Sequence, residues 1–415
     1  MTIQTDAMTN TLCLLMAGGR GERLYPLTKD AAKPSVRFGG IYRIVDFTLS
    51  NCLNSNIRKI YVLTQYRSVS LDRHIRLGWS IFNQELNEYI ECVPPQQRHV
   101  DRWYRGTADS IYQNIYILQQ ERPERVLILS GDHVYKMNYN EMLAFHLEKN
   151  ADLTVAGVEV PRAQATAFGV IGCDDEYRIT SWEEKPSDPK PVPGKTDSSF
   201  ASMGVYIFNT EALVRNVIAD AKDSSSQHDF GKNVVPRMMD SDRVYVHNFR
   251  EANNEASQYW RDIGTLDAYW EANMDLVSLS PQCNLHDPRW PIRTYQEQVP
   301  PAKTVAAGGV GEDEQGVGMV LNSMISGGSV VSGGKVVRSV LSHNVHVSPF
   351  SVVEDSVLLD GVRIGPHAKV RRAIIDQDVV VPEGFAIGYD PKQDATRFTI
   401  SPGGVVAVPR GIRLG

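Results

Sequence analysis

The sequence predicts an α/β protein in which a mainly parallel sheet is followed by a second domain built as a parallel β-helix. In residues 12–160, short apolar runs typical of buried strands alternate with segments of helical period, which is the pattern of βαβ units. In residues 329–383, Val and Ile recur at about every sixth position, a period typical of a parallel β-helix. Because this repeat is irregular, an ordinary β-sandwich is the alternative for the second domain.

Apolar runs and proline clusters indicate the elements and the domain boundaries. Residues 281–301 contain five prolines and little periodicity, so they are expected to form a linker between domains. Residues 185–194 contain four prolines and are expected to form a surface loop. The resulting division is a first domain at 1–280, the linker at 281–301 and a second domain at 302–415. The expected strands of the first domain are 12–16, 59–64, 125–130 and 153–158, and its expected helices include 108–120 and 256–276.

Composition and charge narrow the function classes. With 415 residues, of which 42% are hydrophobic and 22% charged, the chain has the make-up of a soluble globular protein with two or more domains. Its net charge of −6 argues against a nucleic-acid binder, which usually has a basic footprint. No run approaches the roughly 20 apolar residues of a membrane span, and Met1–Thr11 lacks the cationic start of a signal peptide. Five scattered cysteines without a CxxC pair predict free thiols in a reducing cytoplasm.

A glycine-rich loop at residues 17–24 follows the first apolar run. Its three glycines expose main-chain N–H groups to a ligand, and Arg20 and Arg23 add donors suited to phosphate oxygens. The spacing is neither the dinucleotide fingerprint nor a Walker A loop, which leaves a plain glycine-rich turn as the alternative. Lys33 follows at short range, and this further cation favours a polyphosphate ligand. The loop therefore predicts a phosphate site at the carboxyl end of the first strand, where α/β sheets bind ligands.

Two aspartates stand next to glycines at the ends of expected elements. Asp132 follows the strand 125–130, and Asp262 comes shortly before Gly264. Mg²⁺ binds through one or two carboxylates together with substrate phosphates, so Asp132 is a candidate magnesium ligand. The alternative is that Asp132 caps the helix near Tyr139. Asp262, taken alone, is better explained as a helix cap than as a metal ligand.

Two further segments combine aromatic, charged and turn-forming residues. Residues 103–109, Trp-Tyr-Arg-Gly-Thr-Ala-Asp, suggest a platform for a base or sugar that opens onto a helix N-terminus. An aromatic corner of the core with a threonine cap is the alternative. In residues 182–186, Lys185 precedes Pro186, and the proline fixes the loop so that the ammonium can be held towards a phosphate. A solvated strand edge is the alternative there.

Together these segments resemble bacterial ADP-glucose pyrophosphorylases, a family also called glucose-1-phosphate adenylyltransferases. The resemblance covers about residues 12–397. Each matching motif is moderately specific alone, and all of them in family order are highly specific. Related nucleotidyltransferases for UTP or dTTP share the glycine-rich loop but differ in the segments around 103–109 and 260–262. The matching motifs are 17–24 with 32–34, 103–109, 131–133, 184–186, 201–208, 228–231 and 259–264.

The resemblance implies a Rossmann-like nucleotidyltransferase domain with a C-terminal left-handed parallel β-helix. It also implies a homotetramer in the cytoplasm that is regulated by small-molecule allosteric effectors. The implied reaction transfers AMP from ATP to α-D-glucose 1-phosphate with the help of Mg²⁺. Its products would be pyrophosphate and ADP-glucose, the latter for glycogen biosynthesis. Neither nucleic acid nor a membrane is an expected partner.

Matched motif by motif, the resemblance also implies roles for individual residues. Arg23, Lys33 and Asp132 would be catalytic, and Asp132 and Asp262 would hold Mg²⁺. The ATP-binding residues would be Gly18, Gly19, Arg23, Gln97, Tyr104 and Gly106. The residues that bind glucose 1-phosphate would be Tyr104, Gly169, Glu184, Lys185, Ser202, Tyr206 and Asp229.

The implied reaction needs no activated side-chain nucleophile. A phosphate monoester has a second pKa of about 6, so the sugar phosphate is already ionised at neutral pH, and the sequence contains no Ser, His or Cys constellation for activating one. What the reaction needs is charge neutralisation and in-line positioning at the α-phosphorus of the nucleotide. The rival interpretations are an enzyme that makes UDP- or dTDP-glucose and a non-catalytic regulatory subunit. The joint presence of Arg23, Lys33, Asp132, Lys185 and Asp262 argues against the second rival.

One position departs from the family pattern. Members activated by fructose 1,6-bisphosphate typically carry a lysine three residues before the position of Lys33, and here that residue is Asp30. Because a carboxylate repels a bisphosphate, this particular activator is not expected. We expect a different effector at the junction of the two domains.

Overall fold

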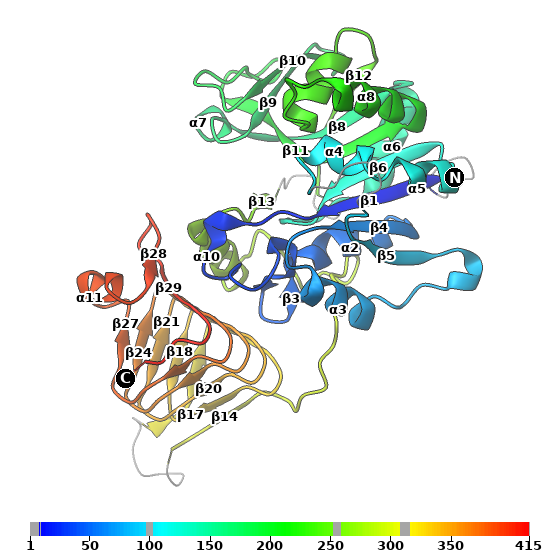
Figure 1. Ribbon diagram of the computed structural model, residues 1–415. Coiled ribbons are helices and arrows are strands. Elements are labelled where there is room, and N and C mark those ends of the chain that lie inside the picture. The colour runs from blue at the N-terminus through cyan, green and yellow to red at the C-terminus, as the bar shows by residue number, and fades with distance from the viewer. Residues whose placement is uncertain (1–7, 9, 97–102, 252–258, 308–315, 415) are drawn as a thin grey trace.

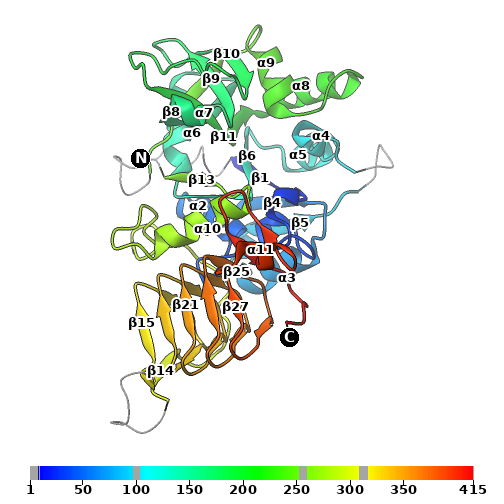
Figure 2. The ribbon, with the colours of Figure 1, turned by 90° about the vertical axis from the view of Figure 1, so that its left-hand side faces the viewer.

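The chain folds into an α/β domain and a β-helix that packs against it (Figure 1). Figure 2, turned by 90°, shows the short strands of the β-helix as a regular stack of coils. The computed structural model describes residues 8, 10–96, 103–251, 259–307 and 316–414.

A nine-stranded mixed sheet forms the centre of the α/β domain, in the order β10-β9-β11-β6-β1-β4-β5 with β8 and β12 added beside β11. The strands β1, β4, β5 and β6 run parallel, as predicted, whereas β11 runs antiparallel to β6. Cys13, Leu14 and Leu15 of β1 are fully buried, because strands pair with both edges of β1 and side chains cover both faces. The bounds are β1 (Thr11–Ala17), β4 (Lys59–Thr64), β5 (Tyr89–Val93), β6 (Arg125–Ser130), β8 (Leu153–Pro161), β9 (Gly169–Cys173), β10 (Ile179–Glu184), β11 (Ser198–Asn209) and β12 (Val244–Asn248).

Helices cover the sheet, and two small two-stranded sheets lie outside it. The small sheets pair β2 (Arg37–Phe38) with β3 (Tyr42–Arg43), and β7 (His133–Tyr135) with β13 (Trp260–Asp262). The helices are α2 (Ile44–Asn54), α3 (Val69–Gly78), α4 (Thr107–Tyr112), α5 (Ile115–Glu121), α6 (Tyr139–Glu148), α7 (Arg162–Ala165), α8 (Thr210–Lys222), α9 (Val235–Met238), α10 (Leu266–Leu276) and α11 (Pro391–Ala395). Single short turns of helix are η1 (Glu22–Leu24), η2 (Lys33–Ser35), η3 (Gln84–Leu86) and η4 (Phe230–Val234).

The four predicted strands are present, but both predicted helices need correction. The helix expected at 108–120 is divided into α4 and α5, because the side-chain amide of Asn114 donates to the Ser110 carbonyl at 2.8 Å and so competes with the helical backbone bond. Residues 256–258 of the helix expected at 256–276 lie outside the described residues; in the remainder, Trp260–Asp262 is the strand β13 and the helix begins at Leu266. Antiparallel pairing with β7 outweighs the helical pattern of the sequence there.

The prediction of a parallel β-helix is confirmed, and the β-sandwich alternative is wrong. Each coil adds a short strand to each of three sheets, and equivalent valines stack along the axis: Val353 pairs with Val336 on one side and Val370 on the other. The first sheet contains β14 (Lys303–Val305), β17 (Val330–Ser332), β20 (His346–Val347), β23 (Arg363–Ile364) and β26 (Val380–Val381). The second contains β15 (Met319–Leu321), β18 (Lys335–Val337), β21 (Val352–Glu354), β24 (Lys369–Arg371) and β27 (Ala386–Ile387). The third contains β16 (Met324–Ile325), β19 (Val340–Leu341), β22 (Val357–Leu358), β25 (Ala373–Ile375), β29 (Val406–Val408) and the antiparallel β28 (Thr399–Ile400).

The third sheet of the β-helix packs on the α/β domain through a shared apolar cluster. Val340, Val357 and Ile374 of the β-helix lie in one buried cluster with residues of α10 and of the N-terminal loops. The indole N–H of Trp270 on α10 donates to the Asp355 carbonyl at 2.7 Å. Residues 281–301 connect α10 with β14 and contain no described helix or strand. None of the described helices has the length and apolar character needed to cross a membrane.

Candidate active site

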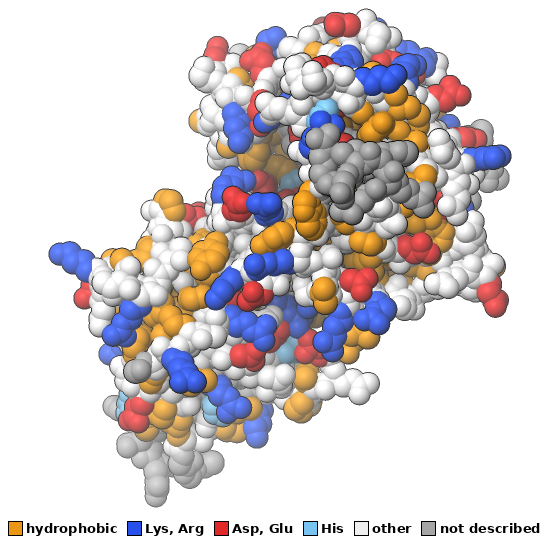
Figure 3. Space-filling model, in the orientation of Figure 1, with side chains coloured by type: hydrophobic (Ala, Val, Ile, Leu, Met, Phe, Trp, Pro, Cys, Tyr) orange, Lys and Arg blue, Asp and Glu red, His pale blue; other side chains and the backbone are white. Residues whose placement is uncertain are grey.

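Two adjoining cavities open at the carboxyl ends of β1, β4 and β6. The first has a volume of about 310 Å³ and the second of about 240 Å³. Met16, Thr107 and Asp229 line both, so the two cavities form one continuous cleft. The space-filling view shows a hollow between the upper part of the α/β domain and the part below it (Figure 3). This position agrees with the rule that α/β sheets bind ligands beyond the carboxyl ends of their strands.

The two cavities divide the residues that the sequence analysis selected. Gln97 lies outside the described residues, and Lys33 and Asp132 lie beside the first cavity, where both are bonded to neighbouring charged groups. The first cavity is lined by Arg23, Gly169, Glu184, Lys185, Ser202, Tyr206, Asp229 and Asp262. The second is lined by Gly18, Gly19, Tyr104, Gly106 and Asp229.

A lysine bridges the two aspartates that were proposed as metal ligands. The Lys33 Nζ atom lies 2.7 Å from Asp132 Oδ2 and 2.9 Å from Asp262 Oδ1. Antiparallel pairing of β13 with β7 aligns Asp262 with His133 and so brings together carboxylates from distant parts of the chain. The helix-cap alternatives are wrong, because Asn138 caps α6 and Thr265 caps α10.

Neighbouring charges keep Asp132 and Lys33 ionised. Burial alone would raise the pKa of Asp132, but the charges of His133 and Lys33 hold it well below the usual carboxyl range. Burial alone would lower the pKa of Lys33, and the two carboxylates outweigh this and raise it. The Lys33 side chain is only 8% exposed, whereas those of Asp132 and Asp262 are 29% and 28% exposed. The carboxylates are therefore accessible from the cleft.

His133, to which the sequence motifs assigned no role, belongs to the same cluster. Ligand atoms of Asp132, His133 and Asp262 all lie within 4.8 Å of one another. The ring of His133 packs edge-on against Trp260, with 5.0 Å between the ring centroids. The signal in the sequence that could have identified His133 is its position directly after Asp132. Two carboxylates are the oxygen ligands that Mg²⁺ prefers, so this donor set fits the cation that the sequence analysis predicted.

The glycine-rich loop faces the second cavity. A Cβ atom at Gly18 would lie 2.9 Å from Cβ of Gln65, whereas one at Gly19 would meet nothing within 4 Å, so the loop is open towards a ligand at Gly19. Among the described residues, no carboxylate oxygen lies within 4.0 Å of a nitrogen of the Arg23 guanidinium. Gln65, which was not among the predicted site residues, accepts a 2.7 Å hydrogen bond from the Tyr104 N–H. It follows β4 directly, and that strand-end position was the signal for finding it.

Close packing explains why a glycine occupies position 106 in the lining of the second cavity. A Cβ atom there would lie 2.3 Å from the His228 carbonyl oxygen, so only glycine fits. The main-chain N–H of Ala108 donates to the same oxygen at 2.9 Å. The neighbouring Asp229 carboxylate accepts a hydrogen bond from the Thr107 hydroxyl at 3.1 Å. This contact orients Asp229 at the point where the two cavities meet.

Lys185 lies where the loop 185–194 leaves β10. Its main-chain N–H donates to the Phe168 carbonyl at 3.0 Å and its φ is +50°, so the backbone is fixed in a turn at this residue. In the described part of the chain, no carboxylate pairs with its ammonium group. Tyr206 lines the same cavity, and burial raises the pKa of its hydroxyl well above the usual value. The first cavity thus offers a free cation, a neutral phenol and carboxylates to one polar ligand.

The fold and the site define the class of the protein as a nucleotidyltransferase with an attached β-helix. The family model described as Nucleotidyl transferase matches residues 12–278. The model described as GlmU-like, C-terminal hexapeptide matches residues 300–408. Together with the three parallel sheets, these matches confirm the predicted Rossmann-like nucleotidyltransferase domain with a C-terminal left-handed parallel β-helix.

Relatives of nearly equal length place the chain within this class. It is 49% identical to the glucose-1-phosphate adenylyltransferase of Koribacter versatilis over 98% of this chain and 97% of the relative. It is 50% identical to the enzyme of that name from Methylococcus capsulatus, over 96% of this chain and 93% of the relative. It is 48% identical to the glucose-1-phosphate adenylyltransferase of Rhodopirellula baltica, over 97% of this chain and 91% of the relative. The chain belongs to the glucose-1-phosphate adenylyltransferase family, as its motifs predicted.

Proposed function

We propose that this chain transfers the adenylyl group of ATP to α-D-glucose 1-phosphate, with ADP-glucose and pyrophosphate as products. The observation that carries the proposal is a cleft of two adjoining cavities with the Lys33–Asp132–Asp262 cluster beside it. The chain that forms this cleft is about 50% identical to glucose-1-phosphate adenylyltransferases. The nucleotide is assigned to the cavity lined by Gly18 and Gly19, and the sugar phosphate to the cavity lined by Lys185. The family resemblance implies that the ADP-glucose is used for glycogen biosynthesis.

The chemistry follows from the charges of the substrates. A phosphate oxygen of the sugar phosphate, ionised at neutral pH because its second pKa is about 6, forms the new bond to the α-phosphorus of ATP. The bond between that phosphorus and the oxygen bridging to the β-phosphate breaks, and pyrophosphate leaves with the electron pair. No proton transfer is needed. The protein contributes positioning and charge neutralisation.

Each cationic residue has a distinct task in this proposal. Arg23, which has no described carboxylate partner, neutralises the triphosphate, and Lys185 holds the phosphate of the sugar. Main-chain N–H groups at Gly18 and Gly19 provide an anion site for the nucleotide phosphates. We propose that Asp132 and Asp262 hold Mg²⁺, which when bound neutralises charge on the phosphates. Lys33 lies between these aspartates and the glycine-rich loop.

Pyrophosphate release separates this function from its rivals. We expect purified protein to release pyrophosphate from glucose 1-phosphate with ATP at a rate far above that with UTP or dTTP. A preference for UTP or dTTP would assign the chain to UDP- or dTDP-glucose synthesis. No release with any of the three nucleotides would indicate a non-catalytic regulatory subunit.

Lys185→Ala should raise KM for glucose 1-phosphate roughly 10- to 100-fold, the range expected when a hydrogen bond to a charged group is lost. KM for ATP should change little, because the contact is assigned to the sugar phosphate alone. Initial rates with each substrate varied in turn measure both constants. Lys190→Ala is the matched control, because Lys190 lies in the same loop and its one described ion pair is an exposed contact with Glu183 at 3.7 Å. Equal increases in both KM values would contradict the role of Lys185.

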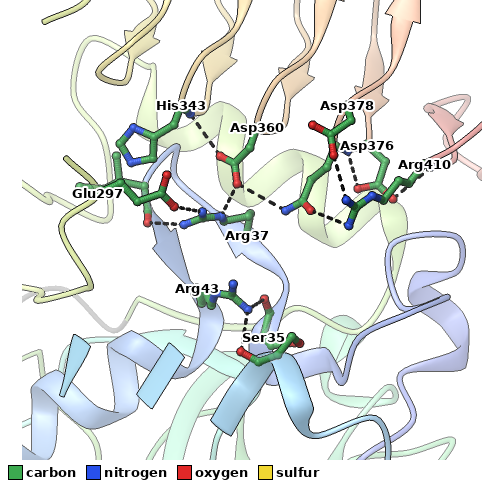
Figure 4. A network of polar contacts seen from close by, with 12 residues as sticks. Ser35, Arg37, Arg43, Glu297, His343, Asp360, Asp376, Asp378 and Arg410 are labelled. Atoms are coloured by element: carbon green, nitrogen blue, oxygen red, sulfur yellow. Dashed lines mark hydrogen bonds and ion pairs between the residues drawn. The ribbon is translucent and has the colours of Figure 1, made fainter. Parts of the chain in front are cut away.

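We also propose that a small anionic effector binds at the junction of the two domains. A cavity of about 900 Å³ there is lined by Arg37, Arg43, Arg73 and Arg410, together with Asp30. Figure 4 shows Arg37 and Arg410 bonded to acidic residues on the β-helix side of this junction. Asp30 among the arginines disfavours a bisphosphate. Rates measured with glycolytic intermediates, AMP and phosphate test the proposal, which fails if none of them changes the rate.

The homotetramer is likewise a proposal, supported by the first coil of the β-helix. Among the described residues, the strands β14 and β15 each pair with the following coil only, and a stack of coils needs a cap or a partner at an open end. Val305, Met319 and Leu321 on these strands are 39%, 42% and 48% exposed. A second copy of the chain would cover them. Sedimentation equilibrium measures the assembly, and a monomer at micromolar concentration would overturn the proposal.

A further inference from the structure

The Lys33 ammonium lies between Asp132 and Asp262, the two carboxylates that are proposed to hold the cation. It contacts one oxygen of each carboxylate, at 2.7 and 2.9 Å. The lysine side chain is almost fully buried, whereas each aspartate still faces the cleft. The Asp132 carboxylate also accepts a hydrogen bond from the Ser130 hydroxyl. In the described structure, Lys33 is therefore the cationic group nearest to both carboxylates, and His133 Nε2 lies farther away, at 3.5 Å from Asp132 and 3.9 Å from Asp262.

We infer that Lys33 is an internal competitor for the divalent cation, and that cation binding releases its ammonium to the nucleotide phosphates. This inference rests on the proposed function, in which Asp132 and Asp262 are the metal ligands. The Lys33 ammonium and a divalent cation would compete for the same two carboxylates, because each is attracted to the negative charge of Asp132 and Asp262. With a cation on the carboxylates, the lysine would lose these partners and become available for another anion.

The path of the lysine side chain fits this role. Lys33 lies on η2, and its Cβ atom is so close to the glycine-rich loop that a Cβ atom at Gly21 would lie 2.9 Å from it. Gly21 also has a φ of +64°, which an L-residue other than glycine adopts only with strain. The ammonium therefore needs no large main-chain movement to pass from the aspartates towards the phosphate site. The free enzyme would stay weak in metal binding until nucleotide arrives with its own negative charge.

Equilibrium binding of Mn²⁺ without nucleotide tests the inference directly. Free Mn²⁺ is measured by electron paramagnetic resonance during titration of the purified wild-type protein and of Lys33→Met. We expect Lys33→Met to bind Mn²⁺ roughly tenfold more tightly or better, because the competing hydrogen bonds to charged groups are absent. Lys33→Gln, which keeps donors but lacks the charge, should also bind more tightly. Equal or weaker binding by both variants overturns the inference.

Two further measurements make the outcome specific. Lys185→Ala removes a lysine from the same cleft that contacts no described carboxylate, so its Mn²⁺ affinity should equal that of the wild type. Asp132→Asn should abolish the tight Mn²⁺ site in the Lys33→Met background. If that site persists without Asp132, the metal assignment of the proposed function fails. If Asp132 is required for Mn²⁺ binding by the wild type but Lys33→Met binds no tighter, only the inference about Lys33 fails.

Thermal melting gives a second readout that does not depend on activity. A ligand that binds only the folded state raises the melting temperature according to its affinity. Mn²⁺ should therefore raise the melting temperature of Lys33→Met more than that of the wild type. Without Mn²⁺, the variant should melt at a lower temperature, because two neighbouring carboxylates have lost their counter-ion. An equal Mn²⁺-induced shift in both proteins contradicts the competition.

Discussion

Asp132→Asn should lower kcat by a factor on the order of 10²–10⁴, the range seen when a group that stabilises transition-state charge is removed. The substitution keeps the size of the side chain and removes its charge. In the structure, Asp132 contacts Lys33 and has the low pKa of a carboxylate that is ionised throughout the physiological range. Pyrophosphate release at saturating ATP and glucose 1-phosphate, across a Mg²⁺ titration, measures the effect. Turnover near that of the wild type would refute the metal role of Asp132.

Glu184→Gln is the matched control for this loss. Glu184 lines the same cavity but lies at the end of β10, outside the Lys33–Asp132–Asp262 cluster. Its replacement should act mainly on KM for glucose 1-phosphate and should leave the Mg²⁺ concentration for half-maximal rate unchanged. Asp132→Asn, in contrast, should raise that Mg²⁺ concentration. Far-ultraviolet circular dichroism of both variants shows whether the fold is retained.

The sequence predicted the elements whose signal is local. Residues 59–64 and 125–130 are strands with those bounds, because their apolar, β-branched runs lie between turn-forming residues. Residues 260–262 were assigned to a helix, since their pattern suits either element and their strand partner is β7, more than a hundred residues earlier in the chain. A partner so distant leaves no periodic signal. This wrongly assigned strand is the one that brings Asp262 to Asp132.

The contacts within the site were predictable only in part. Motifs selected Lys33, Asp132 and Asp262 one by one, but the lysine is 99 and 229 residues away from the two aspartates. No spacing rule links such positions, so the bridge between them appears only in the folded chain. The junction offers a similar case. Arg37 carries no motif signal, and its acidic partners are 260 and 323 residues away.

The guanidinium of Arg37 joins three parts of the chain at this junction (Figure 4). It lies on β2, with Nε 2.7 Å from Asp360 Oδ2 in the β-helix and Nη2 paired with Glu297 in the segment between the domains. Its side chain is 8% exposed. Burial keeps the pKa of Asp360 above its usual value even with Arg37 beside it. Such a buried cluster is costly to break, because the remaining charges stay in a poorly solvated place.

Arg37→Met should therefore destabilise the fold by roughly 3–5 kcal/mol, the cost of removing one partner from a buried ion pair. Without the guanidinium, the pKa of Asp360 should rise further. A carboxyl whose folded-state pKa is raised stabilises the folded state at low pH and loses this contribution as the pH rises. The loss of stability in Arg37→Met, relative to the wild type, should thus be larger at pH 8 than at pH 5. Thermal melts of the variant and the wild type at both pH values measure it.

Two companion variants separate the buried cluster from a general effect of losing an arginine. Arg363→Met removes an exposed arginine of β23 for which no ion pair with a described carboxylate is present, and it should change the melting temperature little. Arg37→Met combined with Asp360→Asn and Glu297→Gln removes all three charges together. This triple variant should be more stable than Arg37→Met alone, because no buried charge is left unpaired. If the single and triple variants have the same melting temperature, the destabilisation comes from lost packing rather than from unpaired charge. The proposed electrostatic role of Arg37 between the domains is then wrong.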